Sequence, residues 1–323
     1  MKTPVTGAGG FIASHLVEEL VHKGHEVRAF VRYNSRNLWG WLEDSPCRNS
    51  VEIISGDVRD YDLVKSAVEG CETVFHLAAL IGIPYSYVSP LAYVRTNVEG
   101  TYNILQVARE CNVGRIIHTS TSEIYGTAQY VPIDEAHPVN PQSPYAASKA
   151  SADFLALSYH RSFGLPVTVV RPFNTYGPRQ SARAIIPTVI SQILDGKETL
   201  SLGNLTPTRD LTFVSETVSG FLAAAVSPQT VGETVNLGTG SEISIGDLVL
   251  KIARIMGREV KITSDEQRVR PAKSEVERLL SNPGKMHALT GWKADISLDE
   301  GLARTVEWMT KHRSLYKSGI YNV

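Results

Sequence analysis

Short apolar runs alternate with amphipathic stretches along the first half of the chain, and this alternation predicts strands joined by helices. Strands are predicted at the apolar runs of residues 3–5, 26–31, 51–55, 73–77, 115–119 and 167–171. The spacing of apolar residues predicts helices at residues 11–23, 91–111 and 145–163. Because strands linked through helices run in parallel, the pattern predicts an α/β fold with helices on both faces of a parallel sheet.

The pattern changes after Arg171, where prolines and glycines interrupt it and shorter helices and strands are mixed. We therefore expect a larger domain at residues 1–172 and a smaller α/β lobe at residues 173–323. The last clear helix is predicted at residues 298–311. The pattern leaves open whether some segments of the second part return to the first sheet.

Composition and charge narrow the class of protein. The chain has 323 residues, of which 42% are hydrophobic, and this suffices for a sizeable core. With 32 basic and 33 acidic residues it lacks the footprint of a nucleic-acid-binding protein. Cys47, Cys71 and Cys111 show neither CxxC nor metal-ligand spacing, so we expect a reduced, cytoplasmic setting and no metal site. No apolar run reaches the roughly 18 residues that span a bilayer, and glycines within residues 7–10 break the N-terminal apolar stretch, so we expect neither a membrane segment nor a signal peptide.

The segment TGAGGFIA at residues 6–13 follows the first predicted strand and opens a helix. Glycines in such a turn let the backbone approach a pyrophosphate, whose charge then lies at the helix N-terminus. The turn therefore predicts a dinucleotide site that involves Gly7 and Gly10. A plain tight turn is the alternative.

The ends of the second and third strands bear on the choice of cofactor. Enzymes that prefer NAD usually place an acidic residue at the end of the second strand, where it bonds the ribose 2′-hydroxyl. Here the position holds Val31 followed by Arg32, whose guanidinium suits the 2′-phosphate of NADP; a solvated basic loop is the alternative. Asp57 follows the third strand, where its carboxylate would lie near the adenine amine or cap a turn.

Tyr145 and Lys149 start a predicted helix and, four residues apart, share one helical face. A free phenol has a pKa of about 10. An adjacent ammonium and a nicotinamide cation would lower that pKa, which makes Tyr145 a candidate base at neutral pH. Thr121 and Glu123 follow the strand at residues 115–119, and open α/β sheets place their sites at such strand ends. Each residue alone is also explained as a turn cap or a loop acid, so the ordered combination with the glycine-rich turn is what indicates a site.

In this order and spacing, the chain resembles the extended short-chain dehydrogenase/reductases, the NAD(P)-dependent epimerase/dehydratase family, over nearly its whole length. The matching segments are TGAGGFIA (6–13), GDV (56–58), HLAA (76–79), NVEGT (97–101), STSEIYG (120–126), SPYAASK (143–149), RPFNTYGPR (171–179), TRD (208–210) and RP (270–271). The resemblance implies a Rossmann-type doubly wound parallel sheet with a smaller α/β substrate-binding lobe. It also implies that Thr121, Tyr145 and Lys149 form the hydride-transfer set.

The resemblance further implies which residues bind the cofactor and the substrate. Besides the turn and strand-end residues above, the implied cofactor contacts are Phe11, Ile12, Val58, Leu77, Ala78, Ala79, Asn97, Thr119, Tyr145, Lys149 and Pro172. The implied contacts of a nucleotide-diphosphate sugar are Ser86, Asn174, Arg179, Arg209 and Arg270. Arginine suits that role because its planar fork pairs phosphate oxygens. The helices at residues 91–111 and 145–163 would pair across a homodimer.

The triplet Thr121-Ser122-Glu123 bears on the reaction. Simple 4-epimerases of the family usually lack Glu at the third position of this triplet, whereas hexose 4,6-dehydratases carry Glu there, often preceded by Asp. In GDP-mannose 4,6-dehydratases the triplet is similar to the Thr-Ser-Glu of this chain. The wider pattern at residues 33–43, 119–135 and 171–187 is similar to the 4,6-dehydratases that act on nucleotide-linked N-acetylglucosamine in legionaminic-type sugar synthesis. UDP-glucuronate decarboxylases also carry Thr-Ser-Glu, so a 4-epimerase and a decarboxylase stay open. A cofactor-sensing regulator is disfavoured because the hydride-transfer set is intact.

The expected reaction begins when Tyr145 takes the O4 proton while C4 gives hydride to the cofactor, with Thr121 bonded to O4 and Lys149 beside the phenolate. Glu123 then removes the C5 proton, water leaves from C6, and hydride returns to C6. Because this cycle regenerates the cofactor, we expect tightly bound NADP or NAD. Serine is a poor acid where related enzymes carry Asp, so Ser122 is expected at most to relay a proton, and Glu123 or water could protonate the leaving hydroxyl instead.

Overall fold

Within residues 2–268 and 271–316, which the computed structural model describes, a seven-stranded parallel sheet forms the centre of the larger part of the chain. The strand order is β3 (Val51–Gly56), β2 (Glu26–Arg32), β1 (Lys2–Thr6), β4 (Thr73–His76), β5 (Arg115–Thr119), β6 (Val167–Pro172) and β11 (Thr234–Leu237). The order reverses direction between β1 and β4, as in a doubly wound Rossmann sheet. The predicted fold class is therefore confirmed.

The inner strands are buried on both faces, which is why successive residues along them do not alternate between buried and exposed positions. All residues of β6 are buried, and so are those of β5 apart from Thr119. In register, Ile117 of β5 lies beside Phe75 of β4 and Thr168 of β6. Parallel strands that helices cover on both faces have this character.

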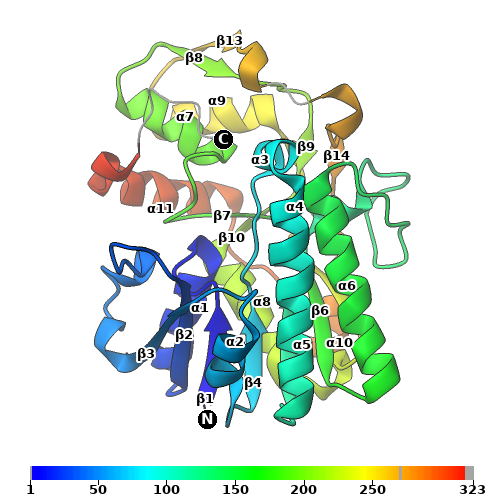
Figure 1. Ribbon diagram of the computed structural model, residues 1–323. Helices are drawn as coiled ribbons and strands as arrows, with labels where there is room; N and C mark the ends of the chain where they lie inside the picture. Colours follow the sequence, from blue (N-terminus) through cyan, green and yellow to red (C-terminus); the bar gives the residue numbers. More distant parts are fainter. Residues whose placement is uncertain (1, 269–270, 317–323) are drawn as a thin grey trace.

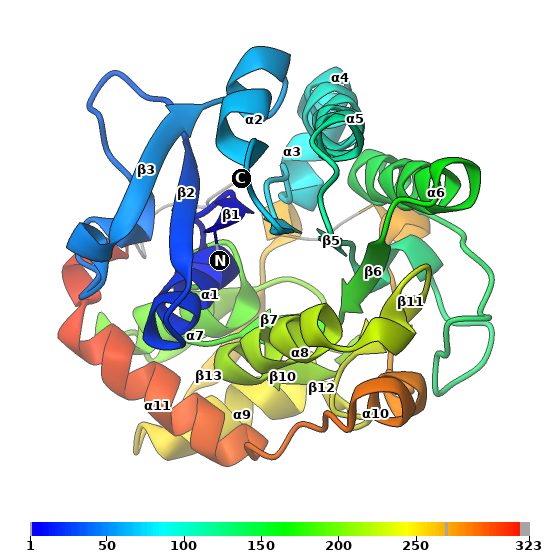
Figure 2. The ribbon, with the colours of Figure 1, turned by 90° about the horizontal axis from the view of Figure 1, so that it is seen from below.

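Helices cover both faces of the sheet (Figure 2). On one face lie α2 (Tyr61–Val68), α5 (Gly100–Glu110) and α6 (Pro144–Phe163), and on the other lie α1 (Phe11–His22), α8 (Val214–Val226) and α10 (Gly284–Thr290). Ile104 of α5 and Phe221 of α8 are buried in the cores of the two faces. The helices predicted at residues 11–23 and 145–163 are confirmed to within one residue at one end.

The helix predicted at residues 91–111 is interrupted, so that prediction was wrong in part. The structure has α4 (Pro90–Tyr93), then a π-helical turn (Val94–Glu99), and only then α5. Apolar spacing does not reveal this turn, because a π-helical turn changes the helical period without removing the apolar face. The turn contains Asn97, whose side-chain bonds are described below.

The smaller lobe lies over the carboxyl ends of the sheet strands (Figure 1). Small sheets build it, in which β7 (Asn174–Tyr176) pairs with β10 (Leu211–Phe213), β8 (Thr199–Leu202) with β13 (Lys261–Ser264), and β9 (Thr208–Arg209) with β12 (Ile243–Ser244) and β14 (Arg278–Leu279). Its helices α7 (Ile185–Leu194), α9 (Ile245–Ile255) and α11 (Leu298–Lys311) share one apolar core. β11 is a strand of the main sheet, and α8 and α10 cover one face of that sheet. The second half of the chain therefore contributes to both parts.

Residues 33–50, which the apolar pattern left unassigned, form a loop between β2 and β3 that reaches across to the lobe. Trp41 N donates to Gly9 O at 3.0 Å, and the edge of the Trp41 ring meets the ring of Trp308 in α11, with centroids 5.6 Å apart. A Cβ on Gly9 or Gly40 would collide with the backbone of the other segment. Close backbone contact therefore fixes this loop against the glycine-rich turn.

Candidate active site

The predicted catalytic residues meet at the carboxyl edge of the main sheet, where β5 ends beside α6. A short 3₁₀ turn (Ser122–Tyr125) follows β5, and Thr121 caps it, since its Oγ1 accepts a hydrogen bond from Glu123 N at 3.2 Å. α6 begins just before Tyr145 and places Lys149 one turn later. The sequence-predicted set is therefore brought together by a strand end, a turn and a helix start.

Tyr145 is 7% exposed, and its hydroxyl forms a hydrogen bond with Thr121. Burial raises the pKa of Tyr145 above its ordinary value; a hydrogen bond with Thr121 opposes the shift, and the charge of Glu123 adds to it. The expectation of a lowered pKa is therefore wrong for the protein groups by themselves. It counted on an ammonium beside the phenol, and the structure bonds that ammonium elsewhere.

Lys149 is 4% exposed, and its Nζ donates to Thr119 O at 2.5 Å. Burial lowers the pKa of Lys149 from 10.5 to about 8, because water no longer solvates the charge, and Asp153 opposes this shift. The ammonium form still dominates at neutral pH. Lys149 can therefore stabilise an anion that forms near the end of β5.

Asn97 holds the loop after β4 against α6. Its Oδ1 accepts from Leu80 N at 2.8 Å, and its Nδ2 donates to Leu80 O at 3.0 Å and to Ser148 Oγ at 2.9 Å. The predicted cofactor residues 77–79 stand in the same loop. Asn97 thus positions this loop, and a direct contact with the cofactor stays a prediction.

The glycine-rich turn has the geometry of an anion site. Gly7 has φ +69°, and a Cβ there would lie 2.9 Å from Ala78 Cα. Thr6 Oγ1 accepts from Leu77 N and Ala78 N, each at 3.1 Å, which brings the turn against the loop after β4. No side chain caps the N-terminus of α1 at Gly10. These features fit the pyrophosphate of a dinucleotide, which would take the free N–H groups of α1.

Two buried polar atoms at the same edge have no hydrogen-bond partner within the described residues. They are Thr119 Oγ1, at the end of β5, and Asn174 Oδ1, at the start of β7. Buried polar atoms in native proteins are nearly always bonded. Thr119 is among the predicted cofactor contacts and Asn174 among the predicted substrate contacts, so both fit groups that bond a ligand.

Asp57, which follows β3, bonds within a local turn, and its contact with the adenine amine stays a prediction. Asp57 accepts from Arg59 N at 2.9 Å and pairs with the Arg59 guanidinium at 2.6 Å. These bonds hold the pKa of Asp57 below its usual range, and the charge of Arg32 contributes. Asp57 thus closes a local turn, the alternative given above, while Arg32 lies exposed at the end of β2.

The predicted substrate residues are used in different ways. Arg209 is 7% exposed and lies 3.4 Å from the carboxylate of Glu275. Ser86 is buried in α3 (Ile83–Val88), where its hydroxyl donates to Ile83 O at 2.6 Å. Arg270 lies outside the described residues.

Arg179 reaches back to the cofactor helix α1. It has φ +70°, and its guanidinium lies 2.8 Å from Glu18 Oε1 and donates to Ser14 Oγ at 3.2 Å. In this arrangement it joins the loop after β7 to α1. A contact between Arg179 and substrate stays a prediction.

Sequence reasoning missed Asp153, a buried carboxylate on α6 that accepts from Arg171 Nε at 3.1 Å. Two signals were available. Asp153 follows Lys149 by four residues and so shares its helical face, and Arg171 stands in an otherwise apolar strand.

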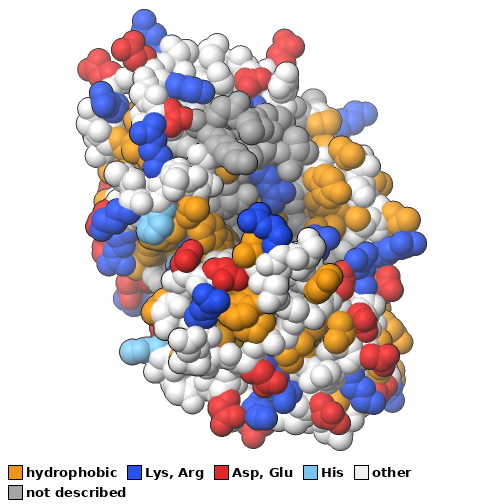
Figure 3. Space-filling view, turned by 60° about the vertical axis from the view of Figure 1, so that its left-hand side comes forward, with side chains coloured by type: hydrophobic (Ala, Val, Ile, Leu, Met, Phe, Trp, Pro, Cys, Tyr) orange, Lys and Arg blue, Asp and Glu red, His pale blue; other side chains and the backbone are white. Residues whose placement is uncertain are grey.

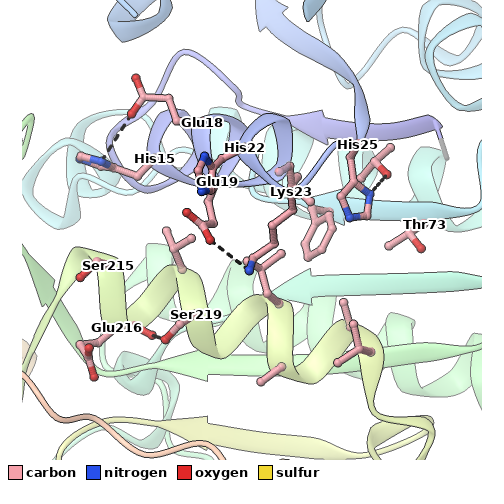
Figure 4. A pocket seen from close by; sticks show the side chains of 18 residues that line it. His15, Glu18, Glu19, His22, Lys23, His25, Thr73, Ser215, Glu216 and Ser219 are labelled. Atoms are coloured by element: carbon pink, nitrogen blue, oxygen red, sulfur yellow. Dashed lines mark hydrogen bonds and ion pairs between the residues drawn. The ribbon is translucent and has the colours of Figure 1, made fainter. Parts of the chain in front are cut away.

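Another groove on the surface lies apart from this site. A groove of about 1080 Å³ lies between α1 and α8 (Figure 4), bordered by polar side chains such as His15, Glu19, His22 and Ser219. It contains none of the predicted site residues. Figure 3 shows the surface hollowed between the two parts of the chain, with Lys and Arg side chains gathered there.

Within residues 2–268 and 271–316, no cluster of three or more His, Cys, Asp or Glu could hold a metal ion, and no helix is long and apolar enough to cross a membrane.

Comparisons with known proteins show the family and the fold of this chain. A family model described as GDP-mannose 4,6 dehydratase matches residues 5–305. A dTDP-glucose 4,6-dehydratase of Streptomyces antibioticus is 33% identical over 321 residues, which are 98% of this chain and 95% of that protein. A UDP-glucose 4-epimerase of Mycolicibacterium smegmatis is 34% identical over 314 residues, which are 95% and 98% of the two chains. The crystal structure of DesIV, a dTDP-glucose 4,6-dehydratase of Streptomyces venezuelae with NAD and TYD bound, superposes with a TM-score of 0.88 at 30% identity, covering 98% and 99% of the two chains.

Proposed function

Because the chain belongs to the GDP-mannose 4,6-dehydratase family, we propose that it is a nucleotide-sugar 4,6-dehydratase. The proposed substrate is a nucleotide-diphosphate hexose, N-acetylglucosamine by preference, and the product is its 4-keto-6-deoxy derivative. Overall likeness does not separate dehydratase from epimerase, since relatives of both kinds are 33% and 34% identical to this chain. The observation that carries the proposal is Glu123, a carboxylate close enough to Tyr145 for its charge to act on the phenol.

The residues at the carboxyl edge fit a nicotinamide dinucleotide. The turn of Gly7 and Gly10 would hold its pyrophosphate, and Thr119 and Lys149 would lie near the nicotinamide half. When bound, the cofactor supplies a hydride acceptor for C4 and a hydride donor for C6. We propose NADP, or a mixture with NAD, because β2 ends in Arg32 and not in an acid.

The first chemical step needs a base at O4. We assign this role to Tyr145, and its hydrogen bond with Thr121 supports the assignment, because Thr121 could then orient O4. Burial makes the phenolate costly, so its formation needs positive charge nearby. The ammonium of Lys149, held at the end of β5, is the protein's contribution to that charge.

The second step separates the candidate reactions. A 4-ketone acidifies the proton on C5, and a base at that carbon leads to loss of the C6 hydroxyl as water. Glu123 is the proposed base, and it is half-buried at the start of the 3₁₀ turn. Ser122 is 2% exposed and stands where related dehydratases carry Asp, so we assign it at most a proton relay.

We assign the substrate's diphosphate to the side of the site that the smaller lobe forms over the carboxyl edge of the main sheet. Asn174 offers a buried oxygen that has no partner in the described part of the chain, and Arg209 offers a guanidinium from β9. Arg270, Ser86 and Arg179 complete the proposed set on the family resemblance. The preference for N-acetylglucosamine rests on the likeness of residues 33–43, 119–135 and 171–187 to that group of dehydratases.

We also propose a homodimer formed through α5 and α6, which lie side by side (Figure 1). Large apolar side chains are exposed on these helices and on α4 and the π-helical turn before them, namely Leu91, Val94, Tyr102, Phe154 and Phe163. Apolar side chains gathered on adjoining elements mark protein interfaces. A second copy of the same helices would cover them.

The test is to incubate the purified protein with UDP-, GDP- and dTDP-linked sugars and to measure product masses. A dehydratase makes a product lighter by one water and incorporates solvent deuterium at C5. A product of unchanged mass that differs at C4 supports the 4-epimerase, and loss of carbon dioxide from a uronate supports the decarboxylase.

Glu123→Gln sharpens the test, because it keeps the size of the side chain and removes the base. Cofactor reduction at C4 should continue, while dehydration falls by about 10²–10⁴, the usual cost of losing a positioned base. Dehydration at the wild-type rate would mean that another residue is the base.

A further inference from the structure

Asp153 is a buried carboxylate that the reaction above does not use. It is 1% exposed and follows Lys149 by one turn of α6. It accepts hydrogen bonds from His118 Nε2 at 3.2 Å, Ser120 Oγ at 2.7 Å and Arg171 Nε at 3.1 Å. The carboxylate therefore joins α6 to the end of β5 and to β6, directly beneath the site.

Among the titratable groups around Lys149, Asp153 is the buried carboxylate. The titratable groups on the surrounding elements are Tyr145 and Asp153 of α6, His76 of β4, His118 of β5, Glu123 of the 3₁₀ turn, and Arg171 of β6 with its partner Tyr125. Burial lowers the pKa of both histidines and raises that of both tyrosines, so these four are neutral at neutral pH.

Asp153 is ionised in this setting. Burial alone would raise its pKa, but the hydrogen bond from His118 and the charge of Arg171 outweigh burial and hold the pKa below its usual range. One buried carboxylate thus stands among two buried cations, Lys149 and Arg171. Glu123 is the other anion nearby, and it is only half-buried.

We propose that Asp153 is a positioning residue that keeps Lys149 in its ammonium form at the end of β5. A buried ammonium tends to lose its proton, and an opposite charge within a few ångströms restores the charged form. Burial lowers the pKa of Lys149, and Asp153 is the charge that opposes this shift. The proposal rests on the proposed role of Lys149 in hydride transfer, which dehydratase and epimerase share.

The experiment measures the titration of Lys149 directly. Isotope-labelled lysine is incorporated into the whole protein, and the Lys149 resonance is assigned in NMR spectra by its loss in Lys149→Met. In Asp153→Asn the midpoint of the Lys149 titration should fall by about one pH unit or more, the size of shift that a close buried charge produces. An unchanged midpoint would overturn the proposal, and this readout does not depend on which sugar the enzyme accepts.

The matched variants separate charge from architecture. Ser120→Ala removes one hydrogen bond to the carboxylate but keeps the charge, and Asp153→Glu keeps the charge on a longer side chain; both should leave the Lys149 midpoint near that of the wild type. If Ser120→Ala shifts the midpoint as far as Asp153→Asn does, the network acts through packing and the proposal fails.

A charge-balanced variant covers the case in which Asp153→Asn does not fold. Asp153→Asn/Arg171→Gln removes both members of a buried ion pair, which proteins tolerate better than the loss of one. Its Lys149 midpoint should also fall. In the reaction, the alkaline limb of the pH profile for cofactor reduction should move to lower pH by the same amount, whereas product mass tests the dehydratase proposal separately.

Discussion

Lys149 gives the protein a pH dependence of stability that its replacement should remove. Burial lowers the pKa of the ammonium to about 8, against 10.5 for the ordinary side chain. Between these pH values the unfolded chain binds a proton that the folded chain has released, so the free energy of unfolding rises with pH. A difference of about 2.5 pH units, at about 1.36 kcal/mol per unit, makes this rise about 3 kcal/mol. Below pH 8 the folded protein bears the full cost of the buried charge.

Lys149→Met keeps a long apolar side chain at this position and titrates nothing there. Urea unfolding of both proteins from neutral pH to pH 10.5 gives the free energy of unfolding at each pH. The wild type should gain about 3 kcal/mol relative to Lys149→Met across this range, because all other titrating groups cancel in the difference. Lys311→Met, which replaces an exposed lysine of α11, should show no such trend. If the difference in free energy of unfolding between the wild type and Lys149→Met is the same at every pH, the burial argument is refuted, whatever the size of that difference.

The remaining predictions concern the base, the cofactor turn and the cofactor. Tyr145→Phe removes only the hydroxyl that takes the O4 proton, so turnover should be lost while the melting temperature and the dinucleotide content change little; near-normal turnover would reject Tyr145 as the base. Gly7→Ala places a methyl 2.9 Å from backbone at φ +69°, so the purified protein should lose its dinucleotide, whereas Gly24→Ala, at φ +81° with no atom within 4 Å, should retain it. Equal dinucleotide content in the two variants would exclude this turn as the cofactor loop. Mass spectrometry of the dinucleotide released on denaturation should find NADP, alone or with NAD; NAD alone would assign Arg32 another purpose.

Local pattern determined the strands of the first half of the chain, two of its long helices and their order along the sequence. β5 and β6 could be predicted because strands buried on both faces are rich in apolar and β-branched residues, and α1 and α6 because one buried face needs apolar residues at helical spacing. The location of Thr121 and Glu123 was also predictable, since open parallel sheets place their sites at the carboxyl ends of strands, whereas the meeting of Thr121 with Tyr145 was implied by the family resemblance. These features depend on periods of two to four residues, which the sequence displays directly.

Contacts between distant residues were decided only by the tertiary structure. The π-helical turn at Val94–Glu99 accompanies the bonds of Asn97 to Leu80 and Ser148. Trp41 meets Trp308 across more than half the chain. No local period records such pairings, because each is set by the packing of whole elements against one another.

The pKa values of the site residues were likewise decided only by the tertiary structure. The spacing of Tyr145 and Lys149 predicted an ammonium beside a phenol, yet the ammonium bonds Thr119 O and the pKa of the phenol rises. Desolvation depends on everything that surrounds a group, including Asp153 one turn along the helix. Sequence could therefore name the reacting residues, whereas their protonation was decided by how deeply the fold buries them and which charges it buries with them.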